Sequence, residues 1–174
     1  MKMIETETQF LQFLDDNRIP YHRVEHPPVY TCEEAARLRP HLEGVSTKNL
    51  FLRDKRGCFC LVMTDCDKRV DLKELARQLG APKLHFGSEE KLRELLGLAR
   101  GAVTVLGLVN DHEQRVRLLI DSEIWDGETF LCHPLVNTAT LVLAKADLER
   151  FFELTGHKAW LVGIPGRSYP TFSH

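Results

Sequence analysis

Two apolar runs joined by a short polar turn constrain the fold of this 174-residue chain more than any other feature. The runs cover residues 49–53 and 58–64, and the turn between them, residues 54–57, ends in Gly57. Runs of this length are typical of strands, and glycine supplies the positive φ that a tight connection often requires. The pattern therefore predicts an antiparallel hairpin, and with it a sheet.

Other segments have the apolar period of amphipathic helices, and most of them begin at a capping residue. Thr31 is followed three residues later by Glu34, which matches a capping box at the start of a short helix. Asp71 and Ser88 are placed to cap two further helices. Besides the helix that begins at Thr31, the expected helices cover residues 7–17, 72–79, 89–96 and 146–154.

Short strand-like runs dominate the second half of the chain, where they are separated by turn residues. Because helices and hairpins are intermingled, we expect an α+β fold: a single domain with a mixed, mostly antiparallel sheet flanked by helices. The domain is expected to span residues 1–163, and residues 164–174 to form a flexible C-terminal tail. Besides the hairpin, the expected strands are residues 21–25, 103–105, 116–120, 129–132, 139–143 and 159–162.

Composition and charge exclude several classes of protein. Hydrophobic residues make up 43% of the chain and charged residues 28%, which argues against disorder. The formal net charge of −2 creates no overall field that would attract polyanions. Residues 48–83 contain nine Lys or Arg against five acidic residues, a local net charge of +4, which fits either a solvated surface or a local RNA contact.

The cysteines and the apolar runs indicate the compartment. Five cysteines form no secretory framework, and the N-terminus lacks the apolar core of a signal peptide, so we expect a cytoplasmic protein with reduced thiols. Charges interrupt every apolar run before the roughly 20 residues needed to cross a bilayer, which argues against membrane insertion.

A zinc site would need about four ligands, which could be counted from Cys58, Cys60, Cys66 and His85, but these residues include no Cys-x-x-Cys pair. No metal and no cofactor are expected.

Polar residues stand at the ends of two of the expected strands. Lys48 and Asn49 open the first strand of the hairpin, and His133 and Asn137 follow the strand at residues 129–132. If the two strand ends meet, they form a pocket with a positive charge, an imidazole and amide donors, suited to an anionic or ester-bearing ligand. Each residue also has a structural interpretation as a surface lysine, a strand-end hydrogen bond or a cap. Gly101 either exposes backbone amides to a ligand or ends a helix.

Four ordered blocks of sequence resemble the YbaK/prolyl-tRNA synthetase-associated family, specifically its freestanding branch that deacylates mischarged alanyl-tRNA(Pro). The blocks are residues 26–31, 48–52, 107–111 and 130–137, and the resemblance spans nearly the whole chain. It implies the fold of that family and a hydrolase that cleaves the aminoacyl ester without a covalent intermediate.

The resemblance also implies roles for particular residues. Lys48 matches the lysine most tied to activity, which holds the phosphate and sugar of the terminal adenosine, while Asn49 and His133 match further site positions. Gly101 opens the loop that places the ester and the attacking water, in which Val105 replaces the family's proline. We therefore expect Lys48, Gly101 and His133 to be catalytic. Substrate-binding residues are expected to be Asn49 and Asn137, together with Val29, Tyr30 and Thr31 as the wall around the acyl group.

The implied substrate is the acceptor end of mischarged tRNA(Pro), with alanine as the expected amino acid. Cysteinyl-tRNA(Pro) is an open alternative, and so is a noncatalytic RNA- or nucleotide-binding module. Prolyl-tRNA synthetase is a possible partner, whereas DNA and membranes are not expected to be partners.

Overall fold

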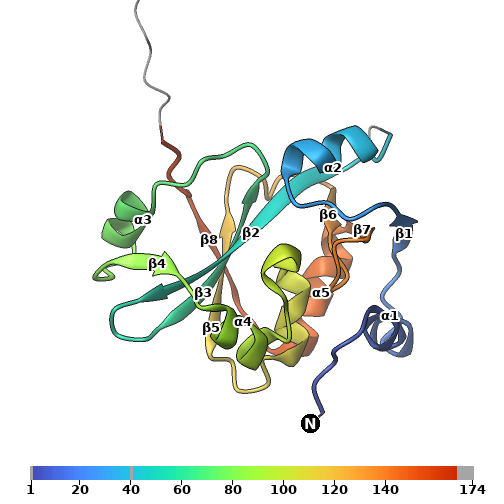
Figure 1. Cartoon of the computed structure of the whole chain (residues 1–174), viewed down its shortest axis with the longest axis horizontal. Helices are drawn as coiled ribbons and strands as arrows, with labels where there is room; N and C mark the ends of the chain where they lie inside the picture. Colours follow the sequence, from blue (N-terminus) through green and yellow to red (C-terminus); the bar gives the residue numbers. More distant parts are fainter. Residues whose placement is uncertain (1, 40, 168–174) are drawn as a thin grey trace, which may run out of the picture.

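The computed structural model describes residues 2–39 and 41–167 and is built around one mixed sheet (Figure 1). The strand order is β1-β7-β6-β2-β3-β5-β8, and β4 pairs with β2 outside this path. Both parallel and antiparallel pairs occur, as the sequence predicted. The strands are β1 (His22–Glu25), β2 (Val45–Asp54), β3 (Phe59–Asp65), β4 (Leu84–Phe86), β5 (Val116–Asp121), β6 (Thr129–Cys132), β7 (Ala139–Ala144) and β8 (Ala159–Val162).

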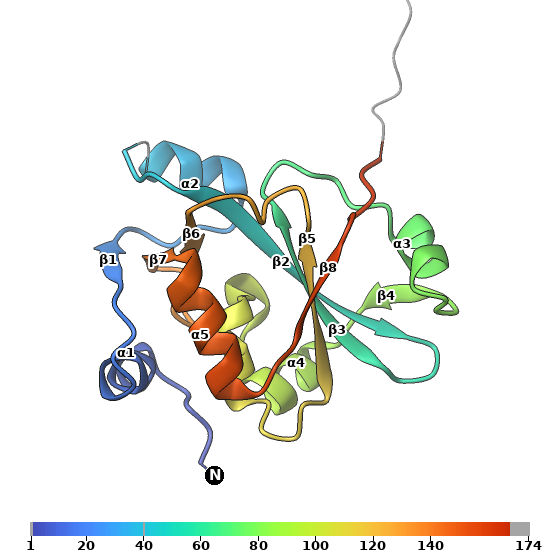
Figure 2. The same ribbon diagram turned by 180° about the vertical axis from the view of Figure 1, so that it is seen from behind.

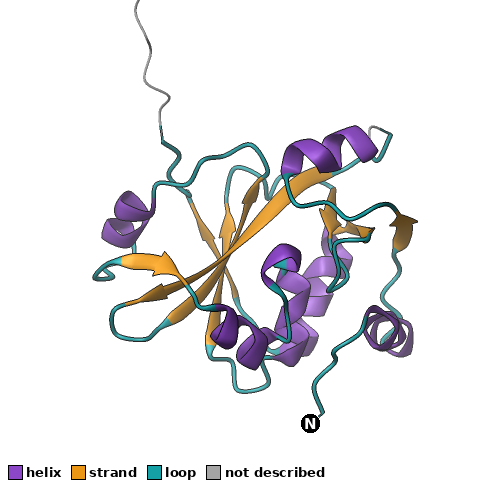
Figure 3. Cartoon of the chain, viewed as in Figure 1, coloured by secondary structure: helices purple, strands orange, loops and turns teal. Residues whose placement is uncertain are grey.

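The expected helices are present (Figure 3), and three of them begin at the capping residues named from the sequence. Thr31, Asp71 and Ser88 each accept a hydrogen bond from a first-turn backbone N–H, which satisfies groups that the helix leaves unpaired. The carboxylate of Glu34 accepts from the Tyr30 N–H rather than from Thr31, so the second half of the expected capping box is absent there. The helices are α1 (Glu7–Asp16), α2 (Cys32–Leu38), α3 (Leu72–Gln78), α4 (Glu89–Leu96) and α5 (Lys145–Thr155), with 3₁₀ turns η1 (Arg100–Ala102) and η2 (Val105–Asn110).

Strand β2 organises the molecule because it has different partners along its length. It forms the predicted hairpin with β3, in which Gly57 has a φ of +86°. Its first residues, Val45 and Ser46, pair in parallel with β6, and its last residues pair with β4. The start of β2 therefore lies beside the end of β6, and the prediction that the two strand ends meet is confirmed.

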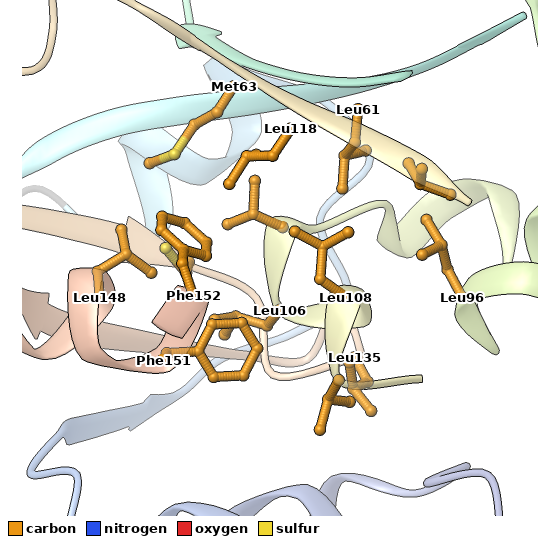
Figure 4. Close-up of a cluster of buried hydrophobic side chains, with 14 of the residues drawn as sticks. Leu61, Met63, Leu96, Leu106, Leu108, Leu118, Leu135, Leu148, Phe151 and Phe152 are labelled. Carbon is orange, nitrogen blue, oxygen red and sulfur yellow. The ribbon is translucent and has the colours of Figure 1, made fainter. Parts of the chain in front are cut away.

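Two apolar clusters cover the two faces of the sheet, following the alternation of side chains along β3. Leu61 and Met63 face the larger cluster, which also contains residues of α1, α4, α5 and η2, while Cys60 and Val62 face a smaller cluster under α3. Figure 2 shows α5 lying across one side of the molecule. The centre of the larger cluster is shown in Figure 4, where the labelled residues are Leu61, Met63, Leu96, Leu106, Leu108, Leu118, Leu135, Leu148, Phe151 and Phe152.

The structure corrects two of the expected secondary-structure assignments. Residues 103–105 are not a strand, because Thr104 caps the η2 turn by accepting a hydrogen bond from the Leu106 N–H. This local bond overrides the β-propensity of Val103 and Val105. Strand β4 was missed because its three residues are too few to give a periodic signal.

The C-terminal segment and the cysteines also differ from expectation. Residues 164–167 are attached to the fold: Ile164 is buried, and the Arg167 N–H donates to the Arg69 carbonyl. The rest of the expected flexible tail, residues 168–174, lies outside the described residues.

Cys32 and Cys66 form a disulfide, so the expectation of five reduced thiols is wrong. The two cysteines are 34 residues apart, and no local pattern in the sequence indicates that they pair. Within the described residues, every helix is too short or too polar to span a bilayer.

Candidate functional site

A cavity of about 180 Å³ lies where α2, the start of β2, the η1 turn and the residue after β6 meet. Figures 1 and 2 both place α2 beside this end of β2 and β6. The side chains around the cavity include three cations and one imidazole. The lining residues are Val29, Tyr30, Thr31, Cys32, Ala35, Arg39, Thr47, Lys48, Asn49, Cys66, Arg100, Gly101, Val103 and His133.

Lys48 brings a cation to the cavity from β2, where it pairs with Thr64 of β3. Burial lowers the pKa of its ammonium, and this effect is partly offset by the charges of Asp65 and Asp67. A half-buried ammonium is costly without a counterion, so the position favours an anionic group in the cavity.

His133 is held in one tautomer by its surroundings. Its Nδ1 lies 3.0 Å from the Ala139 carbonyl oxygen, which can only accept, so Nδ1 carries the proton. Burial lowers the pKa of the ring, and the charge of Arg39 lowers it further, although the bond to Ala139 opposes both. The ring is therefore neutral near pH 7, and its Nε2 is free to accept a proton or a hydrogen bond.

Arg39 also lines the cavity, and sequence reasoning missed it. It stands at the C-terminal cap of α2, where its Nε donates to the Ala35 carbonyl at 3.2 Å and its Nη1 donates to Thr140 Oγ1 at 2.6 Å. Burial lowers the pKa of this guanidinium, with no carboxylate of the described residues contributing to the shift. Arginine nevertheless stays charged. A basic residue at a helix end is ordinary in a sequence, and only the tertiary fold brings it to β7.

Thr140 connects Arg39 to a buried histidine. The Nδ1 of His26 lies 2.8 Å from the Pro27 carbonyl and must donate to it, so in the neutral ring Nε2 accepts the Thr140 hydroxyl proton at 2.8 Å. The bonds then run in one direction, from Arg39 to Thr140, to His26 and to Pro27. The His26 ring lies 6.3 Å from the His133 ring, edge to face, so this network supports the imidazole in the cavity.

Asn49 joins β2 to the loop that contains Gly101. Its Oδ1 accepts a hydrogen bond from the Val105 N–H at 3.2 Å, which leaves its amide nitrogen available to a ligand. A methyl group placed on Gly101 would lie 3.5 Å from the Tyr30 ring and 3.7 Å from the Asn137 amide. Gly101 thus leaves open the space between the loop and the residues that lead into α2.

The structure brings seven of the eight predicted site residues to the cavity. The eighth, Asn137, lies behind it: its side-chain amide donates to the Val29 carbonyl at 3.2 Å, and its own carbonyl accepts from the Val29 N–H. Asn137 thereby supports the wall of the cavity. The described residues contain no cluster of three or more side chains suited to a metal ion. The other seven are Val29, Tyr30, Thr31, Lys48, Asn49, Gly101 and His133.

The chain is similar to known proteins over most of its length. The model of the aminoacyl-tRNA editing domain family matches residues 26–151. A prolyl-tRNA synthetase associated domain-containing protein 1 from Danio rerio is 41% identical over 156 residues, covering 88% of this chain and 85% of that protein. The prolyl-tRNA editing protein ProX of Acetoanaerobium sticklandii is 39% identical over 145 residues, covering 83% of this chain and 88% of that protein.

A solved structure agrees in fold. The crystal structure of a protein assigned as a trans-editing enzyme for prolyl tRNA synthetase superimposes with a TM-score of 0.68 and 22% identity, over 94% of this chain and 99% of that chain. At this identity the likeness concerns the fold alone.

Proposed function

We start from the premise that the chain belongs to the aminoacyl-tRNA editing domain family, and we propose that it is a deacylase that clears mischarged tRNA(Pro). Its relative ProX is named as a prolyl-tRNA editing protein. The observation that carries the proposal is the convergence of Lys48, Asn49, Gly101 and His133 on one cavity. These groups offer a cation, amide donors and a neutral base around a space for an ester.

The size of the cavity supports a small acyl group. Its volume of about 180 Å³ is below the roughly 300–1,000 Å³ of common ligand pockets, so the terminal adenosine would lie at the mouth with the acyl group inside. Val29 and Tyr30 form part of the wall. We propose alanine as the amino acid that is cleared, with proline excluded by its ring, according to the logic of a double sieve.

In the proposed reaction, a water attacks the ester carbonyl, the bond to the ribose oxygen breaks, and the ribose oxygen takes up the proton that the water loses. Lys48 anchors the phosphate of the terminal nucleotide, and the Asn49 amide donates to the ribose or the carbonyl. The Gly101 N–H makes no hydrogen bond with another described residue, so it is available to the developing oxyanion. His133 Nε2 accepts a hydrogen bond from the attacking water or from the neighbouring ribose hydroxyl.

The test is the deacylation of alanyl-tRNA(Pro) by the full chain and by Lys48→Ala. We expect the variant to lose at least about 100-fold in rate, the usual cost of one group that stabilises the transition state. Lys55→Ala is the matched control, because Lys55 is an exposed lysine in the hairpin turn. A fully active Lys48→Ala variant would refute the assignment, and tight tRNA binding without hydrolysis by the unmodified chain would favour a noncatalytic module.

Alanyl- and cysteinyl-tRNA(Pro) compared side by side decide the amino acid, and we expect faster hydrolysis of the alanyl ester. Prolyl-tRNA synthetase is the proposed partner, since it produces the mischarged tRNA. We propose that the protein acts in the cytoplasm, because tRNA is charged there.

A further inference from the structure

The disulfide between Cys32 and Cys66 forms part of the wall of the proposed acyl cavity. Both residues line the cavity, and their Cα atoms lie 5.7 Å apart. Cys66 follows β3, and its N–H donates at 3.0 Å to the carbonyl of Ser46, two residues before Lys48. Cys32 directly follows Thr31. The bond therefore joins the residues beside Lys48 to the residues expected to surround the acyl group.

Helix α2 has few other attachments to the rest of the protein. Ala35 is its one buried residue, and Leu38 is 42% exposed. Beyond the helix, the Arg39 side chain reaches Thr140. Because so little apolar surface holds α2, the covalent bond at its first residue is the main constraint on how closely it covers the cavity.

The remaining cysteines are poorly placed to exchange with this pair. Cys60 and Cys132 are buried, and burial raises the pKa of each thiol to about 12, so neither forms a thiolate at neutral pH. Cys58 is exposed, but it stands at the opposite end of β3 from Cys66. Cys32 and Cys66 themselves are both partly exposed and are accessible to a small thiol.

We propose that Cys32 and Cys66 are a reversible modification site, at which a small disulfide such as glutathione disulfide oxidises the pair and thereby sets the acyl selectivity of the cavity. A thiolate of the pair attacks the small disulfide, one small thiol leaves, and the second cysteine displaces the other small thiol. The protein loses two protons and two electrons, and the small disulfide becomes two thiols. The inference rests on the proposed deacylase function for its consequence, but not for the exchange itself.

The two redox states differ in how firmly α2 closes the acyl cavity. In the disulfide state α2 is fixed against β3, and the wall around Tyr30 and Thr31 holds its shape. In the dithiol state α2 can move outward, so the wall yields to a larger acyl group. Since one methylene of fit is worth about 10–200-fold in selectivity, a small movement has a measurable effect.

The test uses the full chain equilibrated in mixtures of glutathione and glutathione disulfide. Alkylation followed by mass measurement counts the reactive thiols, which are expected to change from three in the reduced protein to one, Cys58, in the oxidised protein. Hydrolysis of prolyl- and alanyl-tRNA(Pro) is measured in the same samples. We expect the ratio of the prolyl rate to the alanyl rate to rise about 10-fold as the disulfide is reduced.

Cys32→Ser and Cys66→Ser are expected to show the raised ratio at every glutathione mixture, and Cys58→Ser to behave like the unmodified chain. A ratio that stays constant while the disulfide titrates would overturn the proposal, as would a pair that never oxidises. The titration of the unmodified chain needs no variant, so poor folding of a serine variant does not affect it. Absence of deacylation in both redox states, with normal thiol exchange, would refute the proposed function and the control of selectivity, but not the exchange.

Discussion

Replacing Thr140 by valine should destabilise the protein, because the hydroxyl of this residue holds the network beside the cavity. Valine has nearly the same shape but no hydroxyl, so the change leaves packing almost intact. Thr140 is fully buried and bonds Arg39 at 2.6 Å and His26 at 2.8 Å. Both bonds would be lost in Thr140→Val.

The expected cost follows from how each partner can respond. His26 is only 8% exposed, so its ring nitrogen would stay unsatisfied at a cost of about 1–3 kcal/mol. Arg39 is half-buried and can recover part of its lost bond from water, which keeps its share near 1 kcal/mol. We therefore expect the free energy of unfolding to fall by about 2–4 kcal/mol.

Urea unfolding of the wild type, Thr140→Val and Thr140→Ser measures this cost. Serine keeps the hydroxyl and loses only a methyl group, so it should recover the hydrogen-bond contribution and retain a smaller loss from packing. A change of less than about 0.5 kcal/mol in Thr140→Val would show that the hydroxyl is unimportant. An equal loss in both variants would show that the methyl group, and not the network, stabilises this region.

Three further predictions concern other groups. Reducing the Cys32–Cys66 disulfide should lower the free energy of unfolding by about 3.8 kcal/mol, the loop-closure value for a separation of 34 residues. Urea unfolding of the two redox forms measures this loss, and free energies of unfolding less than about 1 kcal/mol apart would contradict it. Burial lowers the pKa of His133, and its neutral ring is the proposed active form, so kcat/KM should rise with pH with an inflection below the ordinary histidine pKa of about 6.5. An inflection above that value would contradict the proposed role of His133. Asp111→Asn should lower the free energy of unfolding by about 2 kcal/mol near pH 6. Burial raises the pKa of Asp111, but hydrogen bonds from His157 and from two backbone N–H groups lower it, and the pKa is lowered overall. Since the folded pKa is the lower one, this stabilisation is present above the unfolded pKa and is lost as the pH falls through the folded pKa, so the difference between wild type and variant in acid titrations should shrink there.

Much of the fold could be predicted because local chemistry specifies it. Thr31, Asp71 and Ser88 mark helix starts by their side chains, and the hairpin follows from two apolar runs and Gly57. The strand at residues 103–105 was wrongly predicted because the hydrogen bond from the Leu106 N–H to the Thr104 hydroxyl outweighed β-propensity. Such a bond depends on the backbone path and leaves no periodic trace in the sequence.

The candidate site was predictable in part for a similar reason. Lys48 and His133 stand out in the sequence because they are polar residues at the ends of apolar runs. Gly101 was a candidate because glycine can expose backbone amides, and the wall was inferred from its position before the expected helix at Thr31. Arg39 and the Cys32–Cys66 bond could not be predicted, because each depends on how the fold brings α2 to β7 or to the end of β3. Those partners are 101 and 34 residues away along the chain.

The backbone N–H of Val105 donates to the Asn49 side chain, so a substitution at position 105 can also change what Asn49 presents to the cavity. A proline at position 105, which the resemblance to the family implies there, has no N–H, so the Asn49 oxygen would lose its partner. The side-chain amide could then turn over and present its oxygen to the substrate instead of its nitrogen. In this chain the backbone N–H of Val105 fixes the Asn49 side chain as a donor. One backbone group therefore sets the polarity of one side of the cavity.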